Sequence, residues 1–436
     1  MIKNIELGQT KLSDLHEVFK FNTPSELENK KARLFPSGNT DSEVPTTSIF
    51  LASLGAVKEY RELLLTTIGV NKIKTRNVNL HVYTELQSES KDDRPDGMIV
   101  ITSGKHNPII EWAAFIEVKV STNDITDEQV GRYIEFGKEI GINNIITISN
   151  EMVTHPTNSP VKTKKKSVNL YHWSWSYLKV MASKLVNGNL IKDEDHIYIL
   201  QELRRYMDNH KNLKSYNNMG KDWKEAVTRL HGYDAGQKID TDTLTTISSS
   251  YKQAEKNVSL QLMDKSSHQI EIVSKDDRGP IIEDMLKSSK VISTPFTINR
   301  DKKCQFFVDA DFTRQEIRAC TYITIEKGKA QAQTTALLKL LDSEGVGGSD
   351  DITIKAIYIR NKSIDRIVTL RQLLDERGSG DFYSILDKSF GDEVKRFEIK
   401  TSDLLNRDFQ SAKNFPLKME AAALKFLEQV MYNIIT

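Results

Sequence analysis

The sequence has few cysteines and no long apolar run, and each absence excludes a class of protein. Its 436 residues include only two cysteines, Cys304 and Cys320, which are too few for a disulfide framework or a paired-cysteine zinc knuckle. No apolar segment approaches the roughly 20 residues that a membrane-spanning helix needs. The first residues contain no apolar signal core, so secretion is not expected. We therefore expect a cytoplasmic protein that makes no membrane contact.

Several common catalytic motifs are also missing. The nine histidines show no H-x-x-x-H zinc spacing, and there is no G-x-S-x-G nucleophile elbow. The glycine-rich segments GVGGSDD and ERGSGDF are not followed by the Lys-Ser/Thr of a phosphate-binding loop. The net charge of +1 gives no overall basic field. Any contact with nucleic acid must therefore come from a local patch.

The length of the chain and its changes of pattern predict two domains joined by a connector. Residues 1–210 form the first domain, with a core at about 46–150. Residues 211–244 are polar and basic with scattered aromatic rings, which is typical of a connector that can be helical in parts. Residues 245–436 alternate strand and helix patterns and predict an α+β domain. This second domain could recognise substrate, sense a signal or form a dimer.

Hydrophobic periodicity gives the order of elements in the first domain. Apolar residues at helical spacing predict a helix over 46–69, ending at Gly69. Three strands, a helix, a strand, a strand running into a helix, and a last helix are predicted over 78–86, 97–103, 109–120, 126–141, 143–150, 168–186 and 195–210. A meander followed by a crossover helix and another strand predicts an α/β fold with a mixed sheet flanked by helices.

The second domain is predicted to start with a hairpin-like pair of strands over 258–264 and 268–274. Further strands are predicted over 304–312, 317–325 and 352–360, with helices over 330–342 and 418–435.

The strand 109–120 ends in FIEVKV, where one carboxylate and one amine interrupt an apolar run. Strand periodicity places Glu117 and Lys119 on the same face. Such alternation is typical of a strand with one solvated face, which is the first interpretation. Asp96 supports a second interpretation, because it opens the preceding strand. The start of one strand of an antiparallel pair lies near the end of the next, so Asp96 and Glu117 can converge at one edge of the sheet.

Two carboxylates beside an ammonium group suit phosphodiester hydrolysis. Mg²⁺ prefers one or two carboxylates and fills its other positions with water and phosphate oxygens. A metal ion held in this way polarises the phosphodiester and lowers the pKa of a bound water. Lys119 would position that water or stabilise the negative charge of the transition state.

The helix over 126–141 can contribute to the same edge. Gln129 and Tyr133 are four residues apart and project from one helix face. Two structural roles compete with this one. Thr126 and Gln129 form a capping box at the helix start, and Tyr133 fits an aromatic residue of an amphipathic core.

These motifs resemble the PD-(D/E)XK nuclease superfamily. The resemblance spans roughly residues 46–150 and rests on Pro95-Asp96, Glu117-Val118-Lys119 and Gln129-x-x-x-Tyr133, the last similar to the RecB-type branch. It implies a restriction-endonuclease-like core in which Mg²⁺ or Mn²⁺ is bound by Asp96, Glu117 and the Val118 carbonyl group. It also implies that Lys119 activates water and that Gln129 and Tyr133 orient the site or touch the substrate backbone.

Two further groups of residues are candidates for the site. Many members of the superfamily carry an acid on the first helix, and we favour Glu59 over Glu62 here, although a solvated helix face also accounts for both. Four lysines in a loop could bind phosphates, or could simply be solvated; they are Lys162, Lys164, Lys165 and Lys166.

The favoured hypothesis is a magnesium-dependent endonuclease that acts on DNA, with RNA as a second possible substrate. The alternative is a catalytically silent nucleic-acid-binding or assembly protein on a nuclease scaffold. A homo-oligomer is compatible with either. By analogy of design alone, such a chain suits prokaryotic defence or mobile-element biology.

Overall fold

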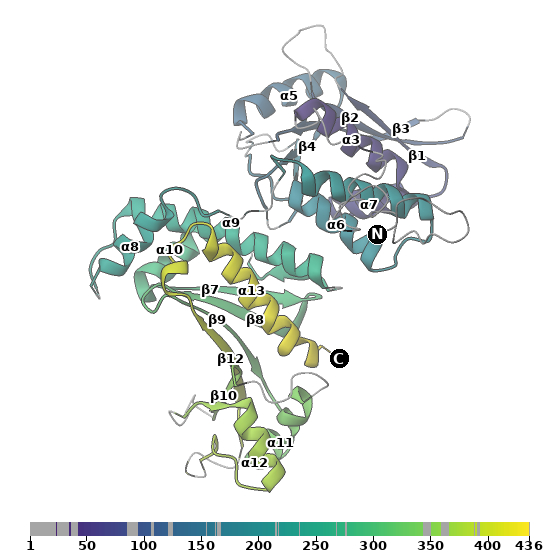
Figure 1. Cartoon of the computed structure of the whole chain (residues 1–436). Coiled ribbons are helices and arrows are strands. Elements are labelled where there is room, and N and C mark those ends of the chain that lie inside the picture. Colours follow the sequence, from purple (N-terminus) through teal and green to yellow (C-terminus); the bar gives the residue numbers. More distant parts are fainter. Residues whose placement is uncertain are drawn as a thin grey trace.

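The fold is described from a computed structural model of the chain (Figure 1). The described residues are 42–84, 95–105, 109–120, 125–153, 155–161, 167–213, 218–234, 236–266, 268–274, 277–342, 350–358, 366–387 and 393–435, with the single residues 23, 35, 163, 216 and 389. Within them, the chain forms two sheets, each flanked by helices, and the predicted mixed α/β class is confirmed.

The first sheet has the strand order β1-β2-β3-β4-β5 within the described residues. Its first three strands are antiparallel, whereas β3, β4 and β5 are parallel. The strands are β1 (Val78–Thr84), β2 (Gly97–Ser103), β3 (Ile109–Val118), β4 (Asn144–Ser149) and β5 (Asn169–Ser174). Each lies where the apolar pattern predicts a strand, and the sheet is mixed as expected.

Helices pack on both faces of this sheet. One face, with Ile116 and Trp173, packs against α3, α4, α6 and α7 in a single apolar cluster. The opposite face, with Phe115 and Ile145, packs against α5. The helices are α3 (Glu43–Ala56), α4 (Lys58–Thr67), α5 (Asp127–Ile140), α6 (Trp175–Asn187) and α7 (Glu194–Asn209), with the 3-10 helix η2 (Asn71–Lys74) after α4.

The single helix predicted over 46–69 is two helices. The chain adopts an extended conformation at Val57, with φ −96° and ψ 107°, which separates α3 from α4. Phe50 and Leu54 of α3 and Leu64 of α4 are still fully buried, because the break redirects the chain without turning either apolar stripe away from the sheet. Helix α3 also begins earlier than predicted, at Glu43.

The second sheet is antiparallel and has the order β11-β10-β12-β9-β8-β7-β6 within the described residues. Its strands are β6 (Ile270–Ile272), β7 (Val291–Ile298), β8 (Asp301–Asp311), β9 (Glu316–Ile323), β10 (Thr353–Ile357), β11 (Val368–Thr369) and β12 (Arg396–Leu404). Its helices are α8 (Trp223–Gly232), α9 (Thr241–Lys265), α10 (Arg278–Ser289), α11 (Ala330–Leu341), α12 (Leu370–Ser379) and α13 (Asn414–Gln429), with the 3-10 helices η5 (Asn406–Asp408) and η6 (Met431–Asn433).

One prediction for the second half of the chain is wrong. The strand predicted over 258–264 lies in the long helix α9, so there is no hairpin with 268–274; β6 pairs with β7 instead. The short run VSLQLMD fits a period of two, but it is also the buried end of a helix. The segment 211–244, for which the sequence predicts a connector that can be helical in parts, contains α8, and Trp223 and Leu230 are fully buried in the second core.

The two units contact each other through α6 and α9. Figure 1 shows α9 at the border between the first unit and the second sheet. Within the part of the chain that the structure describes, none of the helices has the length and apolar character to cross a membrane.

Two glycines of α5 test how tightly this helix packs. A Cβ atom at Gly137 would lie 2.3 Å from the carbonyl oxygen of Ile142, whereas one at Gly131 would meet nothing within 4 Å. We expect Gly137→Ala to lower the free energy of unfolding by about 1–3 kcal/mol, since overpacking costs that much. Gly131→Ala should raise it by up to about 1 kcal/mol. Urea denaturation of the two variants measures both effects, and equal effects would contradict this packing.

Candidate active site

The pairing of β2 with β3 brings the two predicted carboxylates together. Gly97 lies opposite Ile116, so the residue before β2, Asp96, lies beside Glu117. The Val118 N–H donates to Asp96 Oδ2 at 2.8 Å, which fixes the aspartate at the end of β3. The convergence of Asp96 and Glu117 at one edge of the sheet is therefore present in the structure.

Lys119 lies at the centre of the cluster. Its Nζ donates to Glu117 Oε1 at 2.7 Å and to the Val118 carbonyl oxygen at 3.2 Å. The Lys119 backbone is held on both sides, because its N–H donates to Ile148 O at 2.8 Å and its carbonyl accepts from Trp175 Nε1 at 2.9 Å. The strand ends with Lys119 fixed rather than free in solvent.

Helix α5 contributes Gln129 and Tyr133 from the opposite side. The Gln129 side-chain amide donates to Glu117 Oε1. The Tyr133 hydroxyl also hydrogen-bonds to Glu117, and its ring packs near Phe115. Thr126 caps the helix, since its side chain accepts from the Gln129 N–H. Thr126 and Gln129 therefore cap the helix and Tyr133 packs in the core, while Gln129 and Tyr133 also contact Glu117.

Burial controls the charges of the cluster. Glu117 is fully buried, and burial followed by the nearby charge of Asp96 raises the pKa of Glu117 to about 7. Burial also raises the pKa of Asp96, although its hydrogen bond from Val118 opposes the shift. Burial disfavours the charged form of Lys119, but Glu117 and Glu43 outweigh it and raise the pKa of Lys119. The lysine is therefore held protonated beside two carboxyl groups that resist ionisation.

The residues present fit one hard divalent cation. Glu117 Oε2 is buried and has no hydrogen-bond partner among the described residues, which is costly unless another ligand satisfies it. No group of three His, Cys, Asp or Glu residues that could hold a metal ion occurs among the described residues. A site built on Asp96, Glu117 and the Val118 carbonyl therefore suits Mg²⁺ or Mn²⁺, which complete their shells with water and phosphate oxygens, better than Zn²⁺, which prefers a full set of protein ligands.

The acid from the first helical segment is Glu43, which the sequence analysis missed. Its carboxylate lies 3.4 Å from Lys119 Nζ and also raises the pKa of Asp96. Glu59 instead binds His196 Nδ1 at 2.7 Å, and Glu62 lies 3.7 Å from Lys58 Nζ. The start signal that reveals Glu43 is a serine followed by an acid and a proline, Ser42-Glu43-Val44-Pro45.

The predicted phosphate-binding lysines Lys162, Lys164, Lys165 and Lys166 lie outside the described residues. Their contribution to the site stays a prediction.

The raised pKa of Glu117 gives a pH dependence of stability without metal. Between pH 4.5 and about 7 the folded protein keeps a proton on Glu117 that the unfolded chain has lost. The free energy of unfolding therefore falls as the pH rises through this window, by about 1–3 kcal/mol. Urea denaturation in a chelating buffer at pH 5 and 8 measures this fall. Glu117→Gln should flatten it, and an unchanged pH dependence in this variant would contradict the assignment.

Comparison with known proteins finds no match to the chain. No family model, no curated protein and no solved structure matches the chain. The functional interpretation of the cluster therefore rests on its own geometry and on the motifs that resemble the PD-(D/E)XK superfamily.

Proposed function

We propose that this protein is a metal-dependent nuclease with a restriction-endonuclease-like core and that it hydrolyses phosphodiester bonds in DNA. The single observation that carries the proposal is the buried, unpartnered Oε2 atom of Glu117, which lies in one cluster with Asp96 and Lys119. Burying a carboxylate oxygen without a hydrogen-bond partner destabilises the folded state. A cation that binds there would satisfy this oxygen and relieve the repulsion between the two acids.

The element order supports the restriction-endonuclease-like core. The chain runs α3, α4, β1, β2, β3, α5, β4, and the acidic residues lie at the start of β2 and the end of β3. Strand β3 is also where the sheet changes from antiparallel to parallel pairing. The carboxyl ends of β3 and β4 lie at the same edge. Ligands commonly bind at the carboxyl ends of parallel strands.

Each side chain has a role in this chemistry. When bound, Mg²⁺ supplies Lewis acidity and lowers the pKa of a coordinated water. Asp96 and Glu117 would hold the cation, while Gln129 and Tyr133 fix the orientation of Glu117. A water would attack phosphorus as the bond to the leaving oxygen breaks; the attacking water would lose its proton to solvent and the leaving oxygen would take one from solvent. The protonated Lys119 would stabilise the added negative charge. Because its pKa is raised, Lys119 acts as a fixed positive charge rather than as a base.

The proposal predicts cleavage of plasmid or linear DNA that requires Mg²⁺ or Mn²⁺ and stops on chelation. Glu117→Ala and Lys119→Ala should each lower the rate at least about 100-fold, since each removes a charge from the reacting centre. The rate is measured on supercoiled and linear DNA and on RNA of the same sequence.

The matched control is Glu111→Gln. Glu111 lies on the same strand, β3, and its carboxylate pairs with Lys72 at 2.7 Å on the exposed end of the sheet. This variant should cleave at the wild-type rate. Cleavage that survives Glu117→Ala or Lys119→Ala would contradict the active site. A folded wild-type protein that cleaves no nucleic acid in Mg²⁺ or Mn²⁺ would favour the silent binding or assembly protein.

Glu43 contacts Lys119, whereas Glu59, the acid that the sequence favours over Glu62, contacts His196. Glu43→Gln removes one of the two carboxylates that hold Lys119, so it should lower the cleavage rate about tenfold or more. Glu59→Gln breaks only the contact with His196 and should lower the rate less. The cleavage rates of the two variants are measured side by side. A larger fall in rate for Glu59→Gln than for Glu43→Gln would contradict the role of Glu43.

A further inference from the structure

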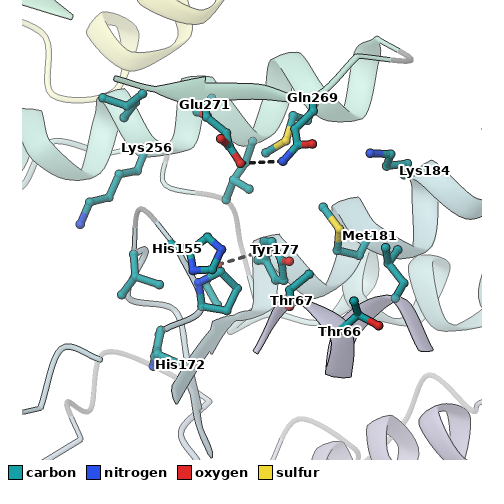
Figure 2. A pocket seen from close by; sticks show the side chains of 18 of the residues that line it. Thr66, Thr67, His155, His172, Tyr177, Met181, Lys184, Lys256, Gln269 and Glu271 are labelled. Atoms are coloured by element: carbon teal, nitrogen blue, oxygen red, sulfur yellow. Dashed lines mark hydrogen bonds between the residues drawn. The ribbon is translucent and has the colours of Figure 1, made fainter. Parts of the chain in front are cut away.

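A pocket of about 340 Å³ lies between the two units, apart from the carboxylate cluster. Helices α4 and α6 and strand β5 line it from the first unit, and α9, β6 and Arg300 line it from the second. Figure 2 shows Gln269 and Glu271 on one side and Thr67, Tyr177 and Met181 on the other. A small-molecule site commonly has a volume of about 300–1,000 Å³ and lies at a domain interface.

Lys256 of α9 is a buried cation in the wall of this pocket. Lys256 is only 9% exposed, and its Nζ donates to the Met152 carbonyl oxygen at 2.7 Å. No carboxylate lies within ion-pair distance of Lys256 in the described part of the chain. Burial, followed by the charge of Lys252, lowers the pKa of Lys256 to about 8. An unpaired buried ammonium group is costly, and an anionic ligand would stabilise it.

The remaining charges of the pocket add to this positive excess. The only acidic residue in its lining, Glu271, is already neutralised by Arg300, whose Nε and Nη2 each donate to one of its carboxylate oxygens at 3.1 Å. Lys74 and Lys184 also line the pocket. In the described residues, neither of them has a carboxylate within ion-pair distance. The pocket is therefore lined by three lysines that form no ion pair with any described residue.

The other side chains suit a flat, partly polar body. Met181, Leu260 and Met263 give an apolar wall, and the Tyr177 ring lies beside them. Gln269 presents an amide, although its nitrogen donates to Glu271 Oε1 at 2.6 Å. A nucleobase has such a body, with apolar faces and polar edges.

The geometry points to a binding site for a small nucleoside phosphate, with the phosphate held by Lys256, the base against Met181 and Tyr177, and the edge of the base toward Lys184 at the opposite end of the pocket (Figure 2). The walls come from both units, so the ligand would touch the nuclease-like unit and the second unit at once. The site is separate from the carboxylate cluster and does not depend on the proposed nuclease activity.

His172 also lines the pocket but is held by the protein itself. Its Nδ1 lies 2.8 Å from Thr147 Oγ1 and its Nε2 lies 2.8 Å from Glu151 O. Both ring nitrogens are thus engaged, and burial lowers the pKa of His172 to about 4. We therefore assign His172 no contact with the ligand.

Calorimetric titration of the full chain with the four nucleoside 5′-monophosphates tests this site. A chelating buffer is used so that no ligand binds through a metal ion. We expect at least one monophosphate to bind, and its nucleoside without phosphate to bind at least about tenfold more weakly. Lys256→Gln and Lys184→Gln should each weaken binding about tenfold or more. Lys184 is half-buried at the rim, so its variant tests the site even if Lys256→Gln does not fold.

The control is Lys179→Gln, because Lys179 lies on α6 as well but pairs with Asp208 at 3.0 Å and does not line the pocket. This variant should bind with wild-type affinity. The site is overturned if no monophosphate binds the wild type, or if Lys184→Gln binds as tightly as Lys179→Gln. The site is also overturned if the lysine variants lose affinity for a single-stranded oligonucleotide but keep wild-type affinity for the monophosphates.

Discussion

The burial of the Glu117 carboxylate is the constraint on which the rest of the site depends. A charged carboxylate that is buried away from water is stable only when other groups replace the hydrogen bonds that water would have donated. Lys119 and Gln129 do this for Oε1, but no described residue partners Oε2, and the neighbouring Asp96 adds a second negative charge. The elements around it follow from this need: β3 places the acid, β4 and α6 fix the lysine backbone, and α5 closes the far side.

Helix α6 connects the two sites of the molecule. Its first residue, Trp175, donates to the Lys119 carbonyl oxygen, while Tyr177, Met181 and Lys184 further along line the pocket between the units. The same helix packs against α9 of the second unit. One helix therefore contributes contacts both to the carboxylate cluster and to the wall of the pocket.

The sequence alone predicts the sheet of the first unit and most of its site, because both depend on local pattern. Strand alternation placed Glu117 and Lys119 on one face, and the order of the strands placed Asp96 beside them. Glu43 was missed because its approach to Lys119 depends on tertiary packing 76 residues apart in the chain. The end of α9 was mistaken for a strand because seven residues cannot distinguish a buried helix from a strand. No sequence motif predicts the pocket, because its lysines come from separate elements of both units.

The most direct test of the central claim is binding of Mn²⁺ to the protein without any substrate, measured by electron paramagnetic resonance of the free ion. The account predicts one Mn²⁺ bound per chain with Asp96 and Glu117 intact, and loss of that ion in the double variant Asp96→Asn, Glu117→Gln. Retention of the ion by the folded double variant would contradict it, and so would a folded wild type that binds no Mn²⁺.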